Sequence, residues 1–191
     1  MFDRIVALIG EDSLNKIKEK HILVIGVGGV GGYAVESLVR SGIENITLVD
    51  YDTIDISNIN RQIIAKENNV DTLFETHYDY IVDACDTLIV KKLLIKRARE
   101  YNIKLITVCG MGKRLDPSKV RICDIKDTSY DPLAKSLRKY VKDEKIKGKI
   151  PVVFSSEEPK KNDKNLVSSM MMVPAVAGIN AAYYVINDII K

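Results

Sequence analysis

The sequence predicts an α/β fold: a Rossmann-like, mostly parallel sheet with helices on both faces and one antiparallel edge. Short apolar runs of strand length alternate with segments of helical periodicity along most of the chain. A glycine-rich turn separates the first apolar run from the helical segment after it, and two later runs end in an aspartate. The chain has 191 residues, enough for one well-packed core, so we expect a single domain over residues 1–191.

The first part of the chain is predicted to form a βαβ unit. Residues 3–19 indicate one or two short helices, and the apolar run 22–25 is typical of a buried strand. Helical periodicity follows over 31–41 and stops at Gly42. Residues 46–49 form a second predicted buried strand, which gives the unit a length of about thirty residues, as a βαβ crossover requires.

Further strands and helices alternate in the rest of the chain. Strands are predicted over 80–84, 104–109, 119–125 and 151–156, and helices over 88–101, 131–145 and 170–190. The alternating pattern of 119–125 suits an antiparallel edge, and Asp131 with Pro132 suits a helix N-cap and first position. The apolar tail contains Asn180 and Asp188, which favours a buried or dimer-packing helix over a membrane span.

One spacing does not suit this fold. Only sixteen residues lie between Arg61 and Tyr78, whereas a crossover helix with its next strand needs about thirty. Either the middle of this protein is shortened, or the sequence omits a segment near Val70–Asp71, and we favour the omission. The polar run 156–169 is a candidate for a second, smaller gap.

The glycine-rich turn comprises Gly26, Gly28, Gly29 and Gly31. Residues without a Cβ let backbone N–H groups approach a phosphate at a helix N-terminus, which indicates nucleotide binding. The turn suits ATP as well as NAD, and a turn needed only for helix–strand packing is the alternative.

Two carboxylates follow the second predicted strand. Asp50 stands nineteen residues after Gly31, where an acid can accept both hydroxyls of a ribose. A turn or capping role is the alternative for Asp50. Asp52 adds a second negative charge, which suits a site where a ribose or a cation offsets it.

The stretch "SNINRQ", residues 57–62, favours ATP over NAD. A dehydrogenase has no evident need for Asn58, Arg61 and Gln62 just past the ribose acid, whereas a triphosphate site does. Arg61 could bind phosphate oxygens and stabilise the charge of a leaving pyrophosphate. A solvated polar loop is the alternative.

These motifs together resemble the ubiquitin-activating-enzyme-like superfamily. The glycine turn, "LVDYD", "SNINRQ" and "VDACD" carry that resemblance, and "FDRIVALIGED", "GMGKRLDPSKVRICDI", "DPLAKSLR" and "VVFSSEEP" are similar to its tRNA threonylcarbamoyladenosine dehydratase branch. The resemblance covers nearly the whole chain. It implies ATP and Mg²⁺ as cofactors, adenylation of a carboxylate, and cyclisation of a threonylcarbamoyl group on tRNA adenosine. The paired C-x-x-C zinc site of the sulfur-carrier branches is absent from the sequence.

The resemblance also implies roles for single residues. The phosphates would lie on Gly28, Gly29 and Gly31, the ribose on Asp50, the triphosphate among Asn58, Arg61 and Gln62, and Mg²⁺ on Asp86. Arg4 would reach the ATP of the partner subunit in a homodimer. A helix N-cap is the alternative for Asp86, and an exposed arginine without a role is the alternative for Arg4. A phosphate-binding lysine is also expected after "NRQ"; Lys66 comes too early, so we expect that lysine in the omitted segment.

Charge and cysteines bear on partners and location. The net charge of +3 alone does not indicate nucleic-acid binding, but residues 113–149 carry twelve Lys and Arg against six Asp and Glu. With a tRNA substrate this stretch is a candidate phosphate track; otherwise it is a solvated helix face. Three scattered cysteines and an N-terminus unlike a signal peptide favour the cytoplasm.

Alternatives to the dehydratase remain at this level. They are adenylation of a ubiquitin-like sulfur-carrier protein, an NAD-dependent dehydrogenase, and an inactive nucleotide-binding module. A sulfur-relay protein is a further candidate partner. Cys85 and Cys109 stand near predicted strand ends, where a catalytic cysteine could lie, although buried cysteines are usually inert.

Overall fold

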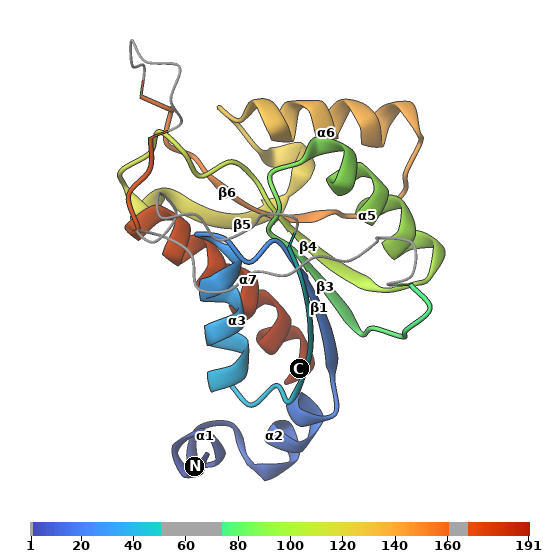
Figure 1. The fold of residues 1–191 in the computed structure, drawn as a ribbon, viewed down its shortest axis with the longest axis vertical. Helices are drawn as coiled ribbons and strands as arrows, with labels where there is room; N and C mark the ends of the chain where they lie inside the picture. Colours follow the sequence, from blue (N-terminus) through green and yellow to red (C-terminus); the bar gives the residue numbers. More distant parts are fainter. Residues whose placement is uncertain (1, 51–73, 161–167) are drawn as a thin grey trace.

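The computed structural model describes residues 2–50, 74–160 and 168–191. Within them, six strands form one sheet in the order β2-β1-β3-β4-β6-β5 (Figure 1). They are β1 (His21–Ile25), β2 (Asn45–Val49), β3 (Tyr80–Asp83), β4 (Lys104–Val108), β5 (Val120–Asp124) and β6 (Pro151–Ser155). Neighbouring strands pair in parallel except β5 and β6, which are antiparallel. The predicted fold class and its antiparallel edge are confirmed.

Helices cover both faces of this sheet. The described helices are α1 (Asp3–Ile9), α2 (Glu11–Lys18), α3 (Gly31–Arg40), α5 (Leu88–Glu100), α6 (Pro132–Asp143) and α7 (Met172–Ile189). Helices α3 and α7 pack on one face, and α5 and α6 on the other (Figure 1). No helix among the described residues is long and apolar enough to cross a membrane.

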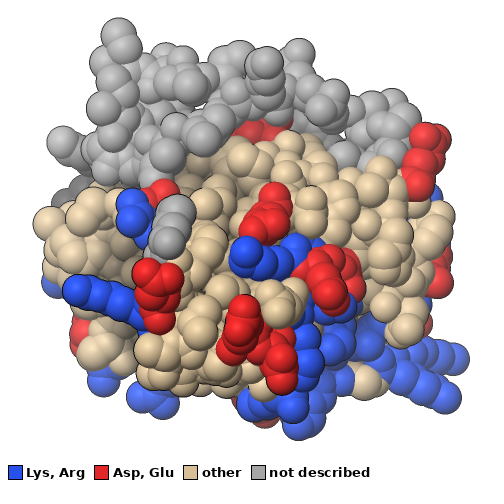
Figure 2. All heavy atoms as spheres, turned by 90° about the horizontal axis from the view of Figure 1, so that it is seen from below, with Lys and Arg blue, Asp and Glu red and all other residues tan. Residues whose placement is uncertain are grey.

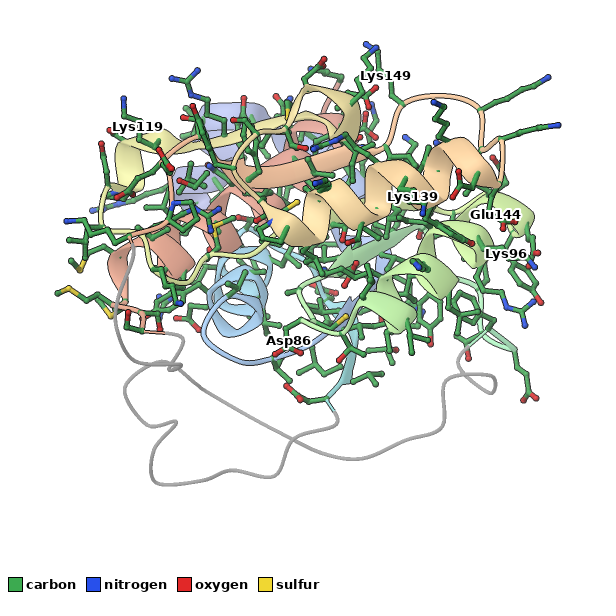
Figure 3. All side chains as sticks on the ribbon, turned by 90° about the horizontal axis from the view of Figure 1, so that it is seen from above. Asp86, Lys96, Lys119, Lys139, Glu144 and Lys149 are labelled. Atoms are coloured by element: carbon green, nitrogen blue, oxygen red, sulfur yellow. The ribbon has the colours of Figure 1, made fainter. Side chains whose placement is uncertain are left out.

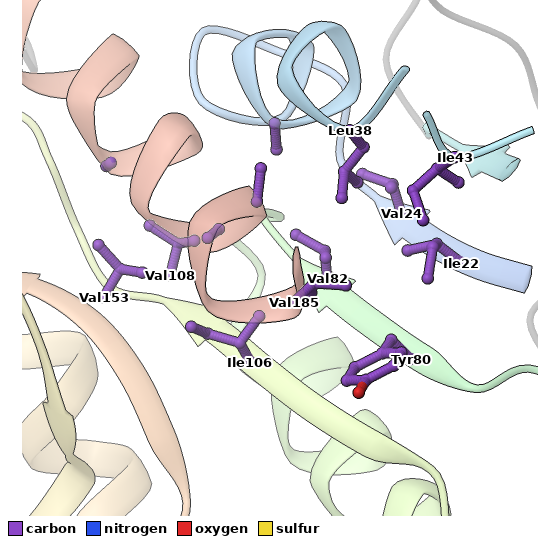
Figure 4. Close-up of a cluster of buried hydrophobic side chains, with 14 of the residues drawn as sticks. Ile22, Val24, Leu38, Ile43, Tyr80, Val82, Ile106, Val108, Val153 and Val185 are labelled. Atoms are coloured by element: carbon purple, nitrogen blue, oxygen red, sulfur yellow. The ribbon is translucent and has the colours of Figure 1, made fainter. Parts of the chain in front are cut away.

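The core consists of two apolar clusters, one on each side of the sheet. Successive residues of β1 alternate between them: Ile22 and Val24 point toward α3 and α7 (Figure 4), while Leu23 and Ile25 point toward α5 and α6. All four side chains are at most 1% exposed. A strand covered on both faces needs apolar residues at every position, and this explains the unbroken apolar run of the sequence.

Strand β2 differs from the prediction of a second buried strand. Only Val49 is fully buried, Asn45 is exposed, and the three residues between them are half-buried. Among the described strands β2 is the last in the sheet order on its side and pairs only with β1. A strand at that position lacks a second neighbour, so its residues lose less solvent contact.

Helix α7 crosses α3 at very close range. A Cβ atom added to Gly178 would lie 2.2 Å from the carbonyl oxygen of Val30 and 2.9 Å from the backbone nitrogen of Ala34. The fully buried Ala177 and Ala181 flank this point and keep the crossing narrow. The buried-helix prediction for the tail is therefore confirmed, and α7 fixes the start of α3 directly after the glycine turn.

A polar clasp joins the end of α7 to the amino ends of two strands. The hydroxyl of Tyr80 donates to Asp188 Oδ2 at 2.6 Å, and Lys104 Nζ donates to the same oxygen at 2.6 Å. Burial, followed by the hydrogen bond to Asp188, raises the pKa of Tyr80 to about 12. The clasp therefore works with a protonated tyrosine and an ionised aspartate at neutral pH.

Candidate active site

The carboxyl ends of β1, β3 and β4 lie side by side and carry the candidate site. Ile25 at the end of β1 pairs with Asp83 at the end of β3, and Asp83 pairs with Thr107 in β4. Loops at this edge of an open parallel sheet form the usual ligand crevice. The glycine turn follows β1, the segment leading to Asp86 follows β3, and a second glycine loop, Gly110–Gly112, follows β4.

The glycine turn is closely packed against the segment after β3. Gly26 has a φ of 84°, and a Cβ there would lie 2.7 Å from the backbone nitrogen of Cys85. A Cβ on Gly31 would lie 1.7 Å from the carbonyl oxygen of Gly26. The Gly32 N–H donates to the carbonyl of Gly28 at 3.0 Å as α3 begins. Glycine is thus required for close packing at Gly26 and Gly31, while Gly28 and Gly29 lie half-buried between them.

Asp50 is brought to this turn. Its Oδ2 accepts a hydrogen bond of 2.6 Å from the backbone N–H of Val27, and the residue is only 9% exposed. The acid expected to hold a ribose therefore contacts the loop expected to hold the phosphates, although 23 residues separate them in sequence. This contact also fixes the path of the turn between β1 and α3.

A buried ion pair lies beneath the edge. Lys91 Nζ lies 3.0 Å from Asp83 Oδ1 and 3.1 Å from Thr107 Oγ1, and the Thr107 hydroxyl donates to Asp83 Oδ2. All three residues are fully buried. Burial, the largest single influence, lowers the pKa of Lys91, but the charge of Asp83 and the further groups around the ammonium together outweigh it and raise that pKa. The sequence gives no signal for this pair, because Lys91 resembles any lysine of a charged helix.

The cysteines at the edge are protonated thiols. Cys85 Sγ donates to Asp83 Oδ1 at 3.0 Å, and burial with the charge of Asp83 raises the pKa of Cys85 far above its ordinary value. Burial, followed by the charge of Asp131, raises the pKa of Cys109 to about 12. A reactive cysteine needs a thiolate, so this geometry favours a structural role for both residues.

Asp86 is exposed and close to the start of α5 (Figure 3). The N-cap of α5 is Thr87, without a side-chain capping bond, so the capping alternative for Asp86 is wrong. Asp86 Oδ1 accepts from the Thr87 hydroxyl at 3.3 Å, and its Oδ2 accepts from no described residue. An exposed carboxylate of this kind fits Mg²⁺, which prefers one or two carboxylates together with substrate phosphates. No group of three or more His, Cys, Asp or Glu that could hold a metal occurs among the described residues.

Arg114 holds together three loops at the far side of the edge. Its guanidinium is buried, forms an ion pair of 3.4 Å with Asp131, and donates to the carbonyls of Gly110, Tyr130 and Glu157. Asp131 also accepts from the Ala134 N–H at 2.8 Å, which confirms the predicted N-cap of α6. The Glu157 carboxylate accepts from two backbone N–H groups just after Arg114. Three sequence stretches that resemble the dehydratase branch therefore meet in one network.

The other predicted site residues are not brought to this edge by the described structure. Arg4 is exposed on α1, which lies near the amino end of β1 (Figure 1). Asp52, Asn58, Arg61 and Gln62 lie outside the described residues, as do Lys66 and the expected gap at Val70–Asp71.

Comparisons with known proteins agree with this geometry. Residues 2–73 match the ThiF family. The chain is 32% identical to tRNA threonylcarbamoyladenosine dehydratase of Bacillus subtilis, a match that covers 100% of this chain and 94% of that protein. Its alignment runs over 240 positions, more than the 191 residues of this chain, so the relative carries residues without a counterpart here.

Solved structures give the same result at the level of the fold. The crystal structure of Escherichia coli tRNA N6-threonylcarbamoyladenosine dehydratase, TcdA, in complex with AMP matches with a TM-score of 0.86 and 30% identity, over 97% of this chain and 92% of that one. The ATP complex of TcdA matches with a TM-score of 0.87 over 98% and 93% of the two chains. These proteins bind adenine nucleotides on the same architecture as the described sheet.

Proposed function

This chain belongs to the ThiF family and, within it, to the tRNA threonylcarbamoyladenosine dehydratases, and from that membership we propose that it uses ATP to dehydrate and cyclise the threonylcarbamoyl group of tRNA threonylcarbamoyladenosine. The observation that carries this proposal is the nearly full-length match to an enzyme of that name solved with AMP and with ATP. The contact between Asp50 and the glycine turn supports the same nucleotide site.

The chemistry follows from the leaving group. Hydroxide leaves a carboxylate poorly at neutral pH, so the carboxylate first attacks the α-phosphate of ATP and releases pyrophosphate. The side chain of the same modification then attacks the acyl-adenylate, closes a ring and expels AMP. The net change is loss of one water from the nucleoside, and no protein nucleophile is required. The enzyme has to position the carboxylate and neutralise the developing charge.

We assign the predicted residues to this reaction as follows. The glycine turn, from Gly26 to Gly31, would bind the phosphates through its backbone N–H groups, and Asp50 would accept the ribose hydroxyls. Arg61 would stabilise the leaving pyrophosphate, with Asp52, Asn58 and Gln62 around the triphosphate. Asp86 would hold Mg²⁺, which neutralises phosphate charge when bound.

The proposal extends to the organisation of the protein. We propose one adenylating domain over 1–191 that lacks a segment near 70–71, and the longer alignment with the Bacillus relative supports this. We also propose a cytoplasmic homodimer in which Arg4 reaches the partner subunit's ATP. A sulfur-relay protein is a further candidate partner.

Incubation of the purified protein with ATP, Mg²⁺ and threonylcarbamoyladenosine-containing tRNA tests the function. Mass spectrometry of the nucleosides should show the nucleoside that has lost one water, together with AMP and pyrophosphate. The names of the matched proteins favour this over adenylation of a sulfur-carrier protein. Pyrophosphate exchange that responds to a ubiquitin-like protein, with no dehydrated nucleoside, would refute the proposal.

A further inference from the structure

Helices α5 and α6 each carry three cations at positions i, i+4 and i+7. On α5 they are Lys92, Lys96 and Arg99, and on α6 they are Lys135, Lys139 and Lys142. Residues with this spacing lie on one face of a helix, so each set forms a row along its helix. We call these six residues the paired basic ridges.

The two ridges belong to neighbouring helices. Lys92 Nζ lies 5.3 Å from the centre of the Tyr140 ring on α6. Lys96, Arg99 and Tyr140 line one open groove of about 370 Å³ between the two helices, together with Glu100 and Glu144. Figure 3 shows Lys96 on α5 and Lys139 on the adjoining α6. The two ridges therefore flank one groove and do not lie on separate faces of the molecule.

The charges of the α6 ridge are not neutralised locally. Its three lysines are exposed, and none forms an ion pair with a carboxylate of the described residues. On α5, Lys96 has only a long contact of 3.9 Å with Glu100, whereas Arg99 donates to the carbonyl of Lys149 at 2.6 Å. By contrast, Lys18 and Lys20 on the other side of the molecule pair with carboxylates at 3.1 and 3.0 Å.

The structure also separates the cations of the basic stretch 113–149 into those that hold loops in place and those that remain accessible. Arg114 is already paired with Asp131 in a buried ion pair, and Arg138 donates to the carbonyl and hydroxyl of Thr128. These two cations hold loops in place. The α6 ridge remains accessible, and α5 adds cations that the sequence stretch did not include. Figure 2, which views the molecule from the α1–α2 end, shows Lys and Arg standing among Asp and Glu on that side.

Both helices start at the edge that carries the candidate active site. Helix α5 follows Asp86, and α6 starts after Asp131, which is bonded to Arg114 beside the second glycine loop. From Lys135 to Lys142 the α6 ridge extends about 10 Å along its helix, at 1.5 Å per residue. The ridges thus lead away from the site in one direction.

We propose that the paired basic ridges bind the phosphate backbone of the tRNA whose modified nucleoside enters the candidate active site. This inference rests on the proposed function, because that function supplies the partner. A nucleoside held at the carboxyl edge leaves the neighbouring nucleotides outside the site, and the ridges offer them aligned cations, of which the three on α6 have no carboxylate partner among the described residues. Lysines bind phosphates without reading sequence, so the ridges would position tRNA and not select it.

The test compares two triple variants of the full chain. The ridge variant is Lys135→Gln with Lys139→Gln and Lys142→Gln. The control is Lys16→Gln with Lys119→Gln and Lys191→Gln, which removes the same charge from other elements. Fluorescence anisotropy should measure tRNA affinity across a salt series, with ATP binding as the check of folding.

The ridge variant should bind tRNA at least about tenfold more weakly at low salt, and its plot of log K against log salt should be shallower by about 2. The control should stay within about twofold of the unmodified protein. Equal affinities and slopes for the two variants would overturn the inference.

Activity separates this inference from the proposed function. The ridge variant should raise the KM for tRNA about tenfold and leave kcat nearly unchanged, because the lysines do not touch the reacting atoms. If the unmodified protein binds tRNA through the ridges but never forms the dehydrated nucleoside, the proposed function fails and the ridges stand. If the ridge variant loses binding to phosphatidylglycerol vesicles but keeps its tRNA affinity, the ridges serve a membrane and the inference is wrong.

Discussion

At the scale of single residues, the clearest prediction for the free energy of unfolding concerns the buried ion pair of Lys91 and Asp83. Lys91→Met would leave the Asp83 carboxylate fully buried without a cation, with only the Thr107 hydroxyl and the thiol and backbone N–H of Cys85 as donors. Losing one partner of a buried ion pair costs about 3–5 kcal/mol. Urea unfolding should therefore show a loss of that size in the free energy of unfolding.

Two further variants make this measurement decisive. Lys96→Met removes a lysine of the same helix whose side chain is 60% exposed, and it should change the free energy of unfolding by less than about 0.5 kcal/mol. The double variant Lys91→Met with Asp83→Asn removes both charges and should be more stable than Lys91→Met alone. A Lys91→Met protein as stable as Lys96→Met would show that Asp83 is not held by this charge.

The raised thiol pKa values lead to a second prediction at this scale. Cys85→Ser keeps a donor toward Asp83 and removes the sulfur nucleophile. Because ring closure needs no protein nucleophile, the rate of dehydrated-nucleoside formation should stay within about threefold of the unmodified enzyme. Cys109→Ser should behave in the same way. A loss of a thousandfold or more in a folded variant would establish a catalytic cysteine instead.

At the scale of elements, the α3–α7 crossing links the tail of the chain to the nucleotide turn. Gly178→Ala would place a Cβ against the Val30 carbonyl and push α3 outward. Overpacking of this kind costs about 1–3 kcal/mol, and the start of α3 should shift with it. We expect lower stability in urea unfolding and weaker ATP binding in calorimetry. Asn180→Ala on the same helix should alter neither, and unchanged ATP affinity in a destabilised Gly178→Ala protein would uncouple the crossing from the site.

The clasp at the end of α7 predicts a pH dependence. Hydrogen bonds from Lys104 and then Tyr80 hold the pKa of Asp188 below its ordinary value of 3.8. A carboxylate with a lowered folded-state pKa stabilises the protein above its unfolded pKa, and this contribution disappears as the pH falls through the folded pKa. Because the pair is partly exposed, Asp188→Asn should cost under about 1 kcal/mol at pH 7.

That cost should shrink as the pH falls below 3.8, which urea unfolding at several pH values can follow. Asn187→Ala provides a neighbour that does not titrate, and its effect should be the same at every pH. An Asp188→Asn difference that stays constant down to pH 3 would contradict the assigned shift.

The elements were predictable where the hydrophobic periodicity agreed with the residues that begin or end a helix or strand. The apolar run before the glycine turn, the acid at the end of β3 and the Asp131 cap each predicted their element. The burial of β2 was overestimated because an apolar run does not show whether the strand has neighbours on both sides. The Lys91–Asp83 pair and the Arg114 network depend on contacts between distant segments, and single-chain patterns carry no signal for such contacts.

At the scale of the whole molecule, the proposed homodimer predicts complementation between two inactive chains. Arg4→Ala would damage the partner subunit's site, and Asp86→Ala would damage the site of its own chain. In a mixed dimer one site would keep both native residues. Each variant alone should be inactive, whereas an equal mixture after subunit exchange should recover about a quarter of the unmodified activity, since half of the dimers are mixed.

Formation of the dehydrated nucleoside measures this complementation, and size-exclusion chromatography of each variant confirms that dimers are present. If the mixture stays inactive while mixed dimers form, Arg4 does not act across subunits. Arg4 would then be an exposed arginine without a role, which is the alternative that the sequence left open.

The close seat of α7 against the sheet also governs how the chain can fold during synthesis. Val173, Ala177, Ala181 and Val185 of α7 fill the apolar cluster between α3 and the sheet. A ribosome releases this segment only after every described strand, so the part of this face that α7 covers stays bare while the nascent chain grows. Bare apolar faces of this kind promote aggregation and recruit chaperones. Helix α7, which is made after every described strand, is therefore the element that closes this apolar cluster.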